Sequence, residues 1–238
     1  MVSQYQIIIK NMSGQAQPFY AVQKQATFSN SGAAPDIRSS CLATGLLAPQ
    51  ASSGAQLDFK FDAQNYAGVK SDAASSSLTA FNASISLAMT ANTSSETSAI
   101  QPIDLTTSAP GQSVDNFSTL TVTPLGLSAP RYQSDLKAGN FGVEIPVYSP
   151  GPVAQLFCGC ATINQDGSII LSCFIAPLPS STVCCAPLPV YYVKLGDIPV
   201  GEIVPYDTAQ AAKCDFTPGY RVINVQYNSD GSFTTKGS

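Results

Sequence analysis

The amino-acid sequence predicts an all-β fold, an antiparallel β-sandwich made of many short strands. Two observations support this prediction. Short runs rich in Val, Ile, Thr, Phe and Tyr recur along the chain with turn residues between them, a spacing typical of sandwiches and barrels. Two Asp-Gly pairs also stand between β-prone segments and predict hairpins near residues 164–168 and 228–232.

The expected strands are short and spread over the whole chain. We place them at residues 5–10, 20–28, 57–61, 84–89, 117–122, 141–148, 154–163, 168–176, 190–195, 220–227 and 232–236. The only helix that the pattern favours covers residues 207–213, where Asp207 or Thr208 would cap an Ala-rich turn. Such a short helix leaves the fold class unchanged.

Turn residues set the expected connections. In both hairpins Gly follows Asp, so that Gly can adopt a positive φ. The segment Ala-Pro-Leu-Pro occurs at residues 176–179 and again at 186–189. Because proline cannot donate to a sheet, these segments are expected at edges or in connections.

The chain length of 238 residues fits one large all-β domain or two small ones, and such a chain buries roughly 70% of its unfolded surface on folding. We expect one sandwich domain over residues 1–238. Residues 66–112 are rich in Ser, Ala and Thr, and we expect strands and long loops there rather than a linker. The alternation of Ile85, Leu87 and Met89 predicts a half-buried strand within them.

Charged residues are scarce. They make up 11% of the chain, whereas about 25% is usual for a globular domain. The net charge is -4 at pH 7 and the sequence pI is about 4.6. Little electrostatic repulsion therefore keeps copies of the protein apart, and mild acidification should remove most of it.

The sequence lacks the residues that several kinds of catalytic and binding site require. Without any His, Ser-His-Asp triads, Cys-His dyads and His-ligated metal sites are excluded. No Gly-rich phosphate cradle is present, and the acidic balance argues against a nucleic-acid partner. We expect no enzyme activity and no cofactor. A glycosidase-type carboxylate pair among the 15 Asp and Glu residues stays open as an alternative.

Membrane and export signals are also missing from the sequence. No apolar run approaches the roughly 20 residues that span a bilayer. Residues 1–11 contain neither a basic leader nor the apolar segment of a secretory signal. We expect no membrane span and no signal peptide.

The cysteines are the most informative residues. The odd count leaves at least one thiol without a partner in the same chain. Cys158 and Cys160 share one face of a strand. A two-residue turn would place Cys160 opposite Cys173, a four-residue turn would place Cys158 there, and a three-residue turn with a bulge would turn Cys173 to the other face. The candidates for disulfides or for assembly are Cys41, Cys158, Cys160, Cys173, Cys184, Cys185 and Cys214.

Cys184 and Cys185 are adjacent, so on an extended segment their side chains point to opposite sides. One of the two would then face solvent and bridge to another molecule in an oxidising compartment. The competing interpretation is that most of these cysteines are small buried hydrophobes. A zinc site is disfavoured because one Cys-x-Cys pair without His does not supply the usual ligand spacing.

Both ends of the chain carry a family resemblance. Four segments resemble the rhizosphere-expressed proteins of soil bacteria. They are residues 3–14 (SQYQIIIKNMSG), 19–24 (FYAVQK), 201–204 (GEIV) and 214–220 (CDFTPGY). The octin-type crystal proteins of fungi belong to the same group. They form large crystals in vacuoles and serve as dense gravity-sensing particles. The resemblance implies this role and a vacuolar location for the chain.

The leading hypothesis is a non-enzymatic structural protein that associates with copies of itself into an ordered array or intracellular crystal, with disulfides between copies reinforcing the contacts. The alternative is a lectin-like module in which Asn, Gln, Ser and Tyr hold a neutral carbohydrate or another polar ligand. An enzyme using a carboxylate pair is the third alternative, and it would show a pH-dependent turnover.

Overall fold

A computed structural model describes residues 4–29, 35–73, 97–109, 112–149, 154–164 and 167–238. Within them the chain forms nineteen strands, arranged in four sheets, and one short helix, α1 (Gln50–Ser53). The all-β prediction is confirmed. The expected strand at residues 84–89 lies outside the described residues.

Two four-stranded sheets come from the two ends of the chain. Sheet A contains, in order, β19 (Phe233–Gly237), β18 (Val222–Tyr227), β1 (Gln4–Asn11) and β6 (Leu57–Asp62). Sheet B contains β17 (Ala212–Asp215), β15 (Val190–Leu195), β2 (Gln17–Gln23) and β5 (Ala43–Leu47). β1 and β18 pair in parallel, and the other neighbours in both sheets pair antiparallel.

The middle of the chain supplies most of the other two sheets. Sheet C contains β10 (Leu125–Leu127), β9 (Phe117–Val122), β11 (Phe141–Glu144), β14 (Thr182–Ala186) and β3 (Thr27–Ser29). Sheet D contains β16 (Ile203–Val204), β4 (Arg38–Ser40), β13 (Ile169–Ile175), β12 (Ala154–Ile163), β7 (Tyr66–Ala73) and β8 (Thr97–Pro102). Here only β9 and β11 pair in parallel.

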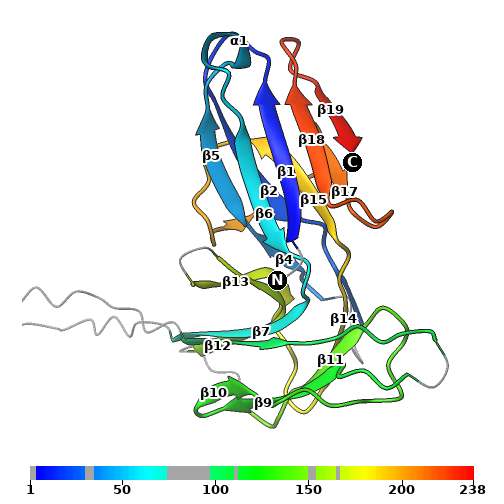
Figure 1. The fold of residues 1–238 in the computed structure, drawn as a ribbon. Helices are drawn as coiled ribbons and strands as arrows, with labels where there is room; N and C mark the ends of the chain where they lie inside the picture. Colours follow the sequence, from blue (N-terminus) through cyan, green and yellow to red (C-terminus); the bar gives the residue numbers. More distant parts are fainter. Residues whose placement is uncertain (1–3, 30–34, 74–96, 110–111, 150–153, 165–166) are drawn as a thin grey trace, which may run out of the picture.

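The sheets stack in two pairs, as Figure 1 shows: A with B in the upper half and C with D in the lower half. Between A and B, the alternating residues Ile7 and Ile9 of β1 are fully buried. Tyr191 from sheet B stacks on Phe61 from sheet A, with ring centroids 4.3 Å apart. Each pair encloses a separate hydrophobic core. The structure therefore has two cores where one sandwich was expected, and the prediction of a single domain over residues 1–238 stays a prediction.

Sheet D carries buried apolar side chains on both faces. The inward side chains of β12 and β13 belong to the core shared with sheet C, whereas Phe157, Ala161, Leu171 and Phe174 form a second cluster on the opposite side. This explains why β13 is buried at nearly every position. A strand with two covered faces reads as a continuous apolar run, so simple alternation is lost.

Both predicted hairpins are present, and each has a three-residue loop. In the first, the Asn164 N–H donates to the Ser168 carbonyl oxygen at 2.9 Å, and Gly167 has a φ of 84°. In the second, the Asn228 N–H donates to the Ser232 carbonyl oxygen at 2.8 Å, and Gly231 has a φ of 85°. The two Ala-Pro-Leu-Pro segments lie in the connections after β13 and β14, as predicted.

The predicted helix at residues 207–213 is wrong. The Asp207 carboxylate accepts a hydrogen bond from the Ala209 N–H at 2.8 Å, so it does close a local turn. Gln210 then adopts a φ of 53°, which ends any right-handed helix. From Ala212 the chain pairs with β15, where Cys214 is buried in the core between sheets A and B. This burial outweighs the weak helix preference of a short Ala-rich segment.

Candidate functional site

Six of the seven cysteines are buried. Cys41 lies in a small cluster beside Tyr20 and Val204, and Cys214 lies in the core between sheets A and B. Four others gather in the core between sheets C and D: Cys158, Cys160, Cys173 and Cys185. Cys184 alone is half-buried. The adjacent pair at positions 184 and 185 therefore divides between the surface and the core, as the strand geometry predicts.

Turn geometry sets the pairing of the core cysteines. The three-residue loop between β12 and β13 places Ala161 opposite Leu171. A bulge then adds Ser172 to β13, and the register shifts by one residue so that Cys160 lies opposite Cys173. The Ser172 hydroxyl donates to the Gln23 side-chain oxygen at 2.7 Å. The bulge thus restores the pairing that a two-residue turn would have produced.

Burial raises the pKa of five of the six buried thiols. It raises the pKa of Cys41 to about 11 and that of Cys173 and Cys214 to about 12. The pKa values of Cys158 and Cys185 are raised further by burial and by neighbouring cysteines. Such thiols are weak nucleophiles at neutral pH. In the described part of the chain, no three His, Cys, Asp or Glu residues are placed to hold a metal ion.

Cys184 belongs to the outward face of sheet C. On β14 it lies opposite Gly142 of β11 and Ser29 of β3. Burial raises the pKa of this thiol, while a hydrogen bond with Ser29 and the positive charge of Lys137 act in the opposite direction. Cys184 is therefore the most accessible cysteine of the described residues, although its thiol is not activated.

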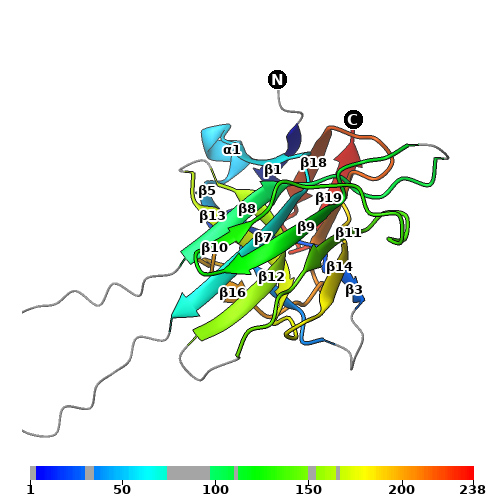
Figure 2. The ribbon, with the colours of Figure 1, turned by 90° about the horizontal axis from the view of Figure 1, so that it is seen from below.

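Residues with hydroxyl side chains share the outward face of sheet C with Cys184. Thr119, Glu144 and Thr182 lie in register across β9, β11 and β14, strands that lie side by side in Figure 2. We call the outward surface formed by Ser29, Thr119, Glu144, Thr182 and Cys184 the hydroxyl face. Glu144 is the only one of these five residues that carries a charge.

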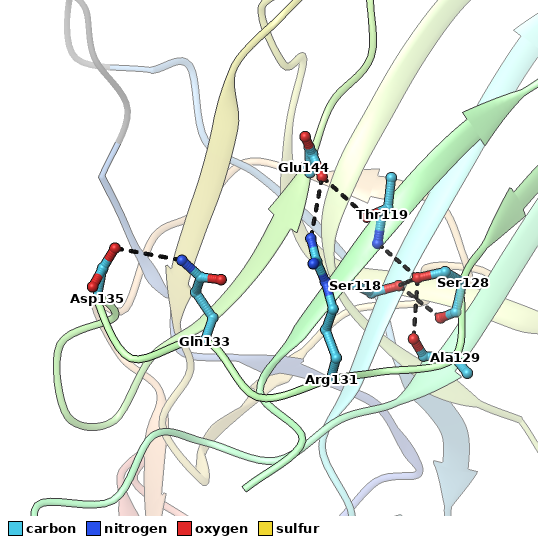
Figure 3. A network of polar contacts seen from close by, with 8 residues as sticks. All are labelled: Ser118, Thr119, Ser128, Ala129, Arg131, Gln133, Asp135 and Glu144. Carbon is cyan, nitrogen blue, oxygen red and sulfur yellow. Dashed lines mark hydrogen bonds and ion pairs between the residues drawn. The ribbon is translucent and has the colours of Figure 1, made fainter. Parts of the chain in front are cut away.

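The carboxylate of the hydroxyl face has partners of its own (Figure 3). Glu144 accepts a hydrogen bond from the Thr119 hydroxyl at 3.1 Å and lies 3.5 Å from the Arg131 guanidinium. Arg131 also lies over the ring of Phe117, 5.0 Å from its centroid. The Thr119 N–H donates to the Ser128 hydroxyl at 3.0 Å, which holds the segment before Arg131 against β9. These contacts neutralise and fix the one carboxylate of the face.

A shallow groove continues the hydroxyl face beyond the ends of β11 and β14. The Ile145 N–H donates to the Ser181 carbonyl oxygen at 2.8 Å, and the Ser180 N–H donates to that of Pro146 at 3.1 Å. Cys184 and Thr182 line the groove together with these residues. At its rim Val147 is 84% exposed. The groove thus combines hydroxyl groups with exposed apolar surface.

A second hollow lies where the two sandwiches meet. This junction cavity has a volume of about 210 Å³. Tyr5 and Asp62 from sheet A, Tyr191 from sheet B, and Cys160 from sheet D contribute to its wall. Gln23, Gln64 and Asn65 add amide groups. Sequence reasoning missed this cavity because its residues come from distant parts of the chain.

The described carboxylates with a displaced pKa show no sign of a general acid. Hydrogen bonds from Lys194 and Ala209 lower the pKa of Asp207, and those from Ser232 lower the pKa of Asp230. Lys213 and Thr217 lower the pKa of Asp215 to about 2. A catalytic acid needs the opposite shift.

Within the described residues, no helix has the length and apolar character needed to cross a membrane. Comparison of the chain with protein-family models, curated proteins and solved structures found no match.

Proposed function

We propose that this protein is a non-enzymatic structural protein that associates with copies of itself into an ordered array or an intracellular crystal. The observation that carries the proposal is the charge content of 11%, since so few charges provide little repulsion between copies. The resemblance to octin-type crystal proteins supports the same role and a vacuolar location. The chain has no His, and the described carboxyl groups with a displaced pKa all have a lowered pKa. Both observations support a role without catalysis.

The hydroxyl face is the proposed contact surface, and its partner is a second copy of the same face. Two copies related by a two-fold axis would use the same patch on both chains, and a residue on the axis, such as Cys184, would meet its own counterpart. Threonine and serine hydroxyls both donate and accept hydrogen bonds, so the same surface can pair with itself. Glu144 does not oppose this contact, because Arg131 already neutralises it.

Cys184 is the proposed covalent link between copies. Two Cys184 thiols would form one disulfide, and their two electrons and two protons would pass to a low-molecular-weight disulfide, which is reduced to two thiols. Exchange requires a thiolate, so acid slows this step while it promotes packing. Association therefore comes first and the covalent bond follows.

A Thr182→Lys substitution tests the contact surface. It adds one charge to the hydroxyl face of each copy, so we expect light scattering at pH 5 to show much weaker association than in the wild type. Thr235→Lys is the matched control, because Thr235 is exposed on β19 of the other sandwich. If Thr235→Lys blocks association and Thr182→Lys does not, the hydroxyl face is not the contact surface.

The junction cavity favours a second candidate function, a lectin-like module for a neutral carbohydrate or another polar ligand. Its tyrosine, amide and carboxylate groups are the side chains that hold sugars by stacking and hydrogen bonding. A glycan array separates the two functions. Saturable binding that a free sugar competes away, and that Asn65→Ala weakens, would favour the module. No binding on the array would favour self-association.

A further inference from the structure

Two buried thiols meet across the core between sheets C and D. The Sγ atoms of Cys160 on β12 and Cys185 on β14 lie 3.1 Å apart. The two residues are separated by 25 positions and belong to opposite sheets. A disulfide bond is roughly 2.0 Å long, so a closure of about 1 Å would join them.

Cys173 is the competing partner, because it lies opposite Cys160 in the β12–β13 register. Its sulfur, however, accepts a hydrogen bond from the Ala26 N–H, with a nitrogen-to-sulfur distance of 3.1 Å. Rotating the Cys173 side chain toward Cys160 would leave that buried N–H without a partner, which is costly. Within the described residues, the Cys185 sulfur makes no comparable contact with a backbone N–H, and its contact is with Cys160.

We propose that Cys160 and Cys185 form an oxidisable thiol pair, whose intrachain disulfide ties the two sheets of the lower sandwich together. The bond would cross the core rather than join neighbouring strands. This site is independent of the proposed link between copies through Cys184.

The junction cavity gives the pair its route to the surface. Cys160 lines the cavity, together with Ala161 and Thr162 of the same strand. Cys185 lies deeper and is fully buried. A small disulfide of the glutathione class would therefore meet Cys160 first, and Cys185 would complete the reaction from within the core.

The reaction is a thiol–disulfide exchange in two steps. The Cys160 thiolate attacks one sulfur of the small disulfide, its S–S bond breaks, and one small thiolate leaves. The Cys185 thiol then attacks the Cys160 sulfur as its proton passes to the second small thiolate, which leaves as a thiol. The two protein protons end on the two released thiols, so the protein loses two electrons and the small disulfide gains them.

Peptide mapping of the wild-type protein tests the proposal directly. No Lys or Arg lies between Lys137 and Lys194, so trypsin cannot separate these cysteines. Cleavage before Asp166 separates Cys160 from Cys173, and chymotryptic cleavage after Phe174 separates Cys173 from Cys185. After treatment with oxidised glutathione, we expect a linked pair of peptides joining the segment of Cys160 to that of Cys185.

Variants assign the link and provide the control. The linked pair should persist in Cys184→Ser, which removes the proposed bond between copies, in Cys173→Ser and in Cys158→Ser, but it should disappear in Cys160→Ser and in Cys185→Ser. Oxidation should raise the Tm by roughly 5 to 10 °C in the wild type and in Cys173→Ser alike. A link from Cys160 to Cys173, or no loss of free thiols in the folded protein, would overturn the proposal.

Discussion

At the scale of single residues, the lower sandwich depends on very close packing around its cysteines. Gly159 separates Cys158 from Cys160 and faces the backbone of β13. A side chain built there would overlap the Cys173 carbonyl oxygen and approach the Phe174 Cα within 2.6 Å. Because backbone atoms cannot rotate away, only glycine fits at this position.

Gly159→Ala should therefore destabilise the protein. We expect the free energy of unfolding in urea to fall by about 1 to 3 kcal/mol, since the strands must move apart to admit the methyl group. Gly14→Ala is the matched control, because a Cβ at Gly14 would meet nothing within 4 Å. Equal stabilities of the two variants would contradict the packing described for β12 and β13.

Asp215 provides a pH-dependent contribution to stability. Its carboxylate accepts hydrogen bonds from Lys213 and Thr217, and its pKa falls to about 2, compared with about 3.9 in an unfolded chain. The contribution is present above pH 4 and is lost as the pH falls toward 2. Asp215→Asn should lower stability at pH 7 by no more than about 1 kcal/mol, because the pair is partly exposed to solvent.

Urea denaturation at pH 7, 4 and 2 measures this effect. The difference between the wild type and Asp215→Asn should shrink toward zero at the lowest pH. Asp104→Asn serves as the control for removing one carboxylate elsewhere in the chain. A difference that stays constant with pH would show that Asp215 contributes through something other than its charge.

At the scale of elements, each Asp-Gly hairpin joins two strands that are consecutive in the sequence and pair with each other. In the last hairpin, Gly231 has a positive φ and the Asp230 carboxylate accepts from the Ser232 N–H at 2.9 Å. The hairpin places β19 at the edge of sheet A, where Phe233 packs 5.1 Å from the Tyr227 ring. Turn chemistry and aromatic packing therefore support the same register.

Gly231→Ala should weaken this hairpin. A non-glycine residue with this positive φ is strained, so we expect a loss of about 1 kcal/mol in the free energy of unfolding. Ser229→Ala is the matched control in the same loop, at an exposed position. If Gly231→Ala is as stable as the control in urea, the left-handed conformation does not matter to the fold.

At the scale of the whole molecule, the sequence predicts individual strands but not the pairing of strands that are far apart in the chain. The strands at residues 117–122, 154–163 and 190–195 match β9, β12 and β15, because each has a clear β-prone composition. The division into two sandwiches depends on pairings such as β1 with β18, which join opposite ends of the chain and leave no mark in local periodicity. For the same reason, the proximity of Cys160 to Cys185 was not predictable.

The candidate contact surface is also only partly predictable from the sequence. Strand alternation predicts that Cys184 and Cys185 point to opposite sides, and the burial of these two residues agrees. It does not predict that Thr119, Glu144 and Thr182 lie in one row with Cys184 beside them, since this row requires the parallel pairing of β9 with β11. The hydroxyl face is therefore a property of the folded molecule.

Sedimentation velocity of the wild-type protein, followed from pH 7 to pH 5 at high concentration, tests self-association most directly. We predict that species larger than one chain grow as the pH approaches the sequence pI of about 4.6, and that they persist in reductant because packing precedes the Cys184 bond. A single species with the mass of one chain at every pH, with or without an oxidant, would contradict the proposed function.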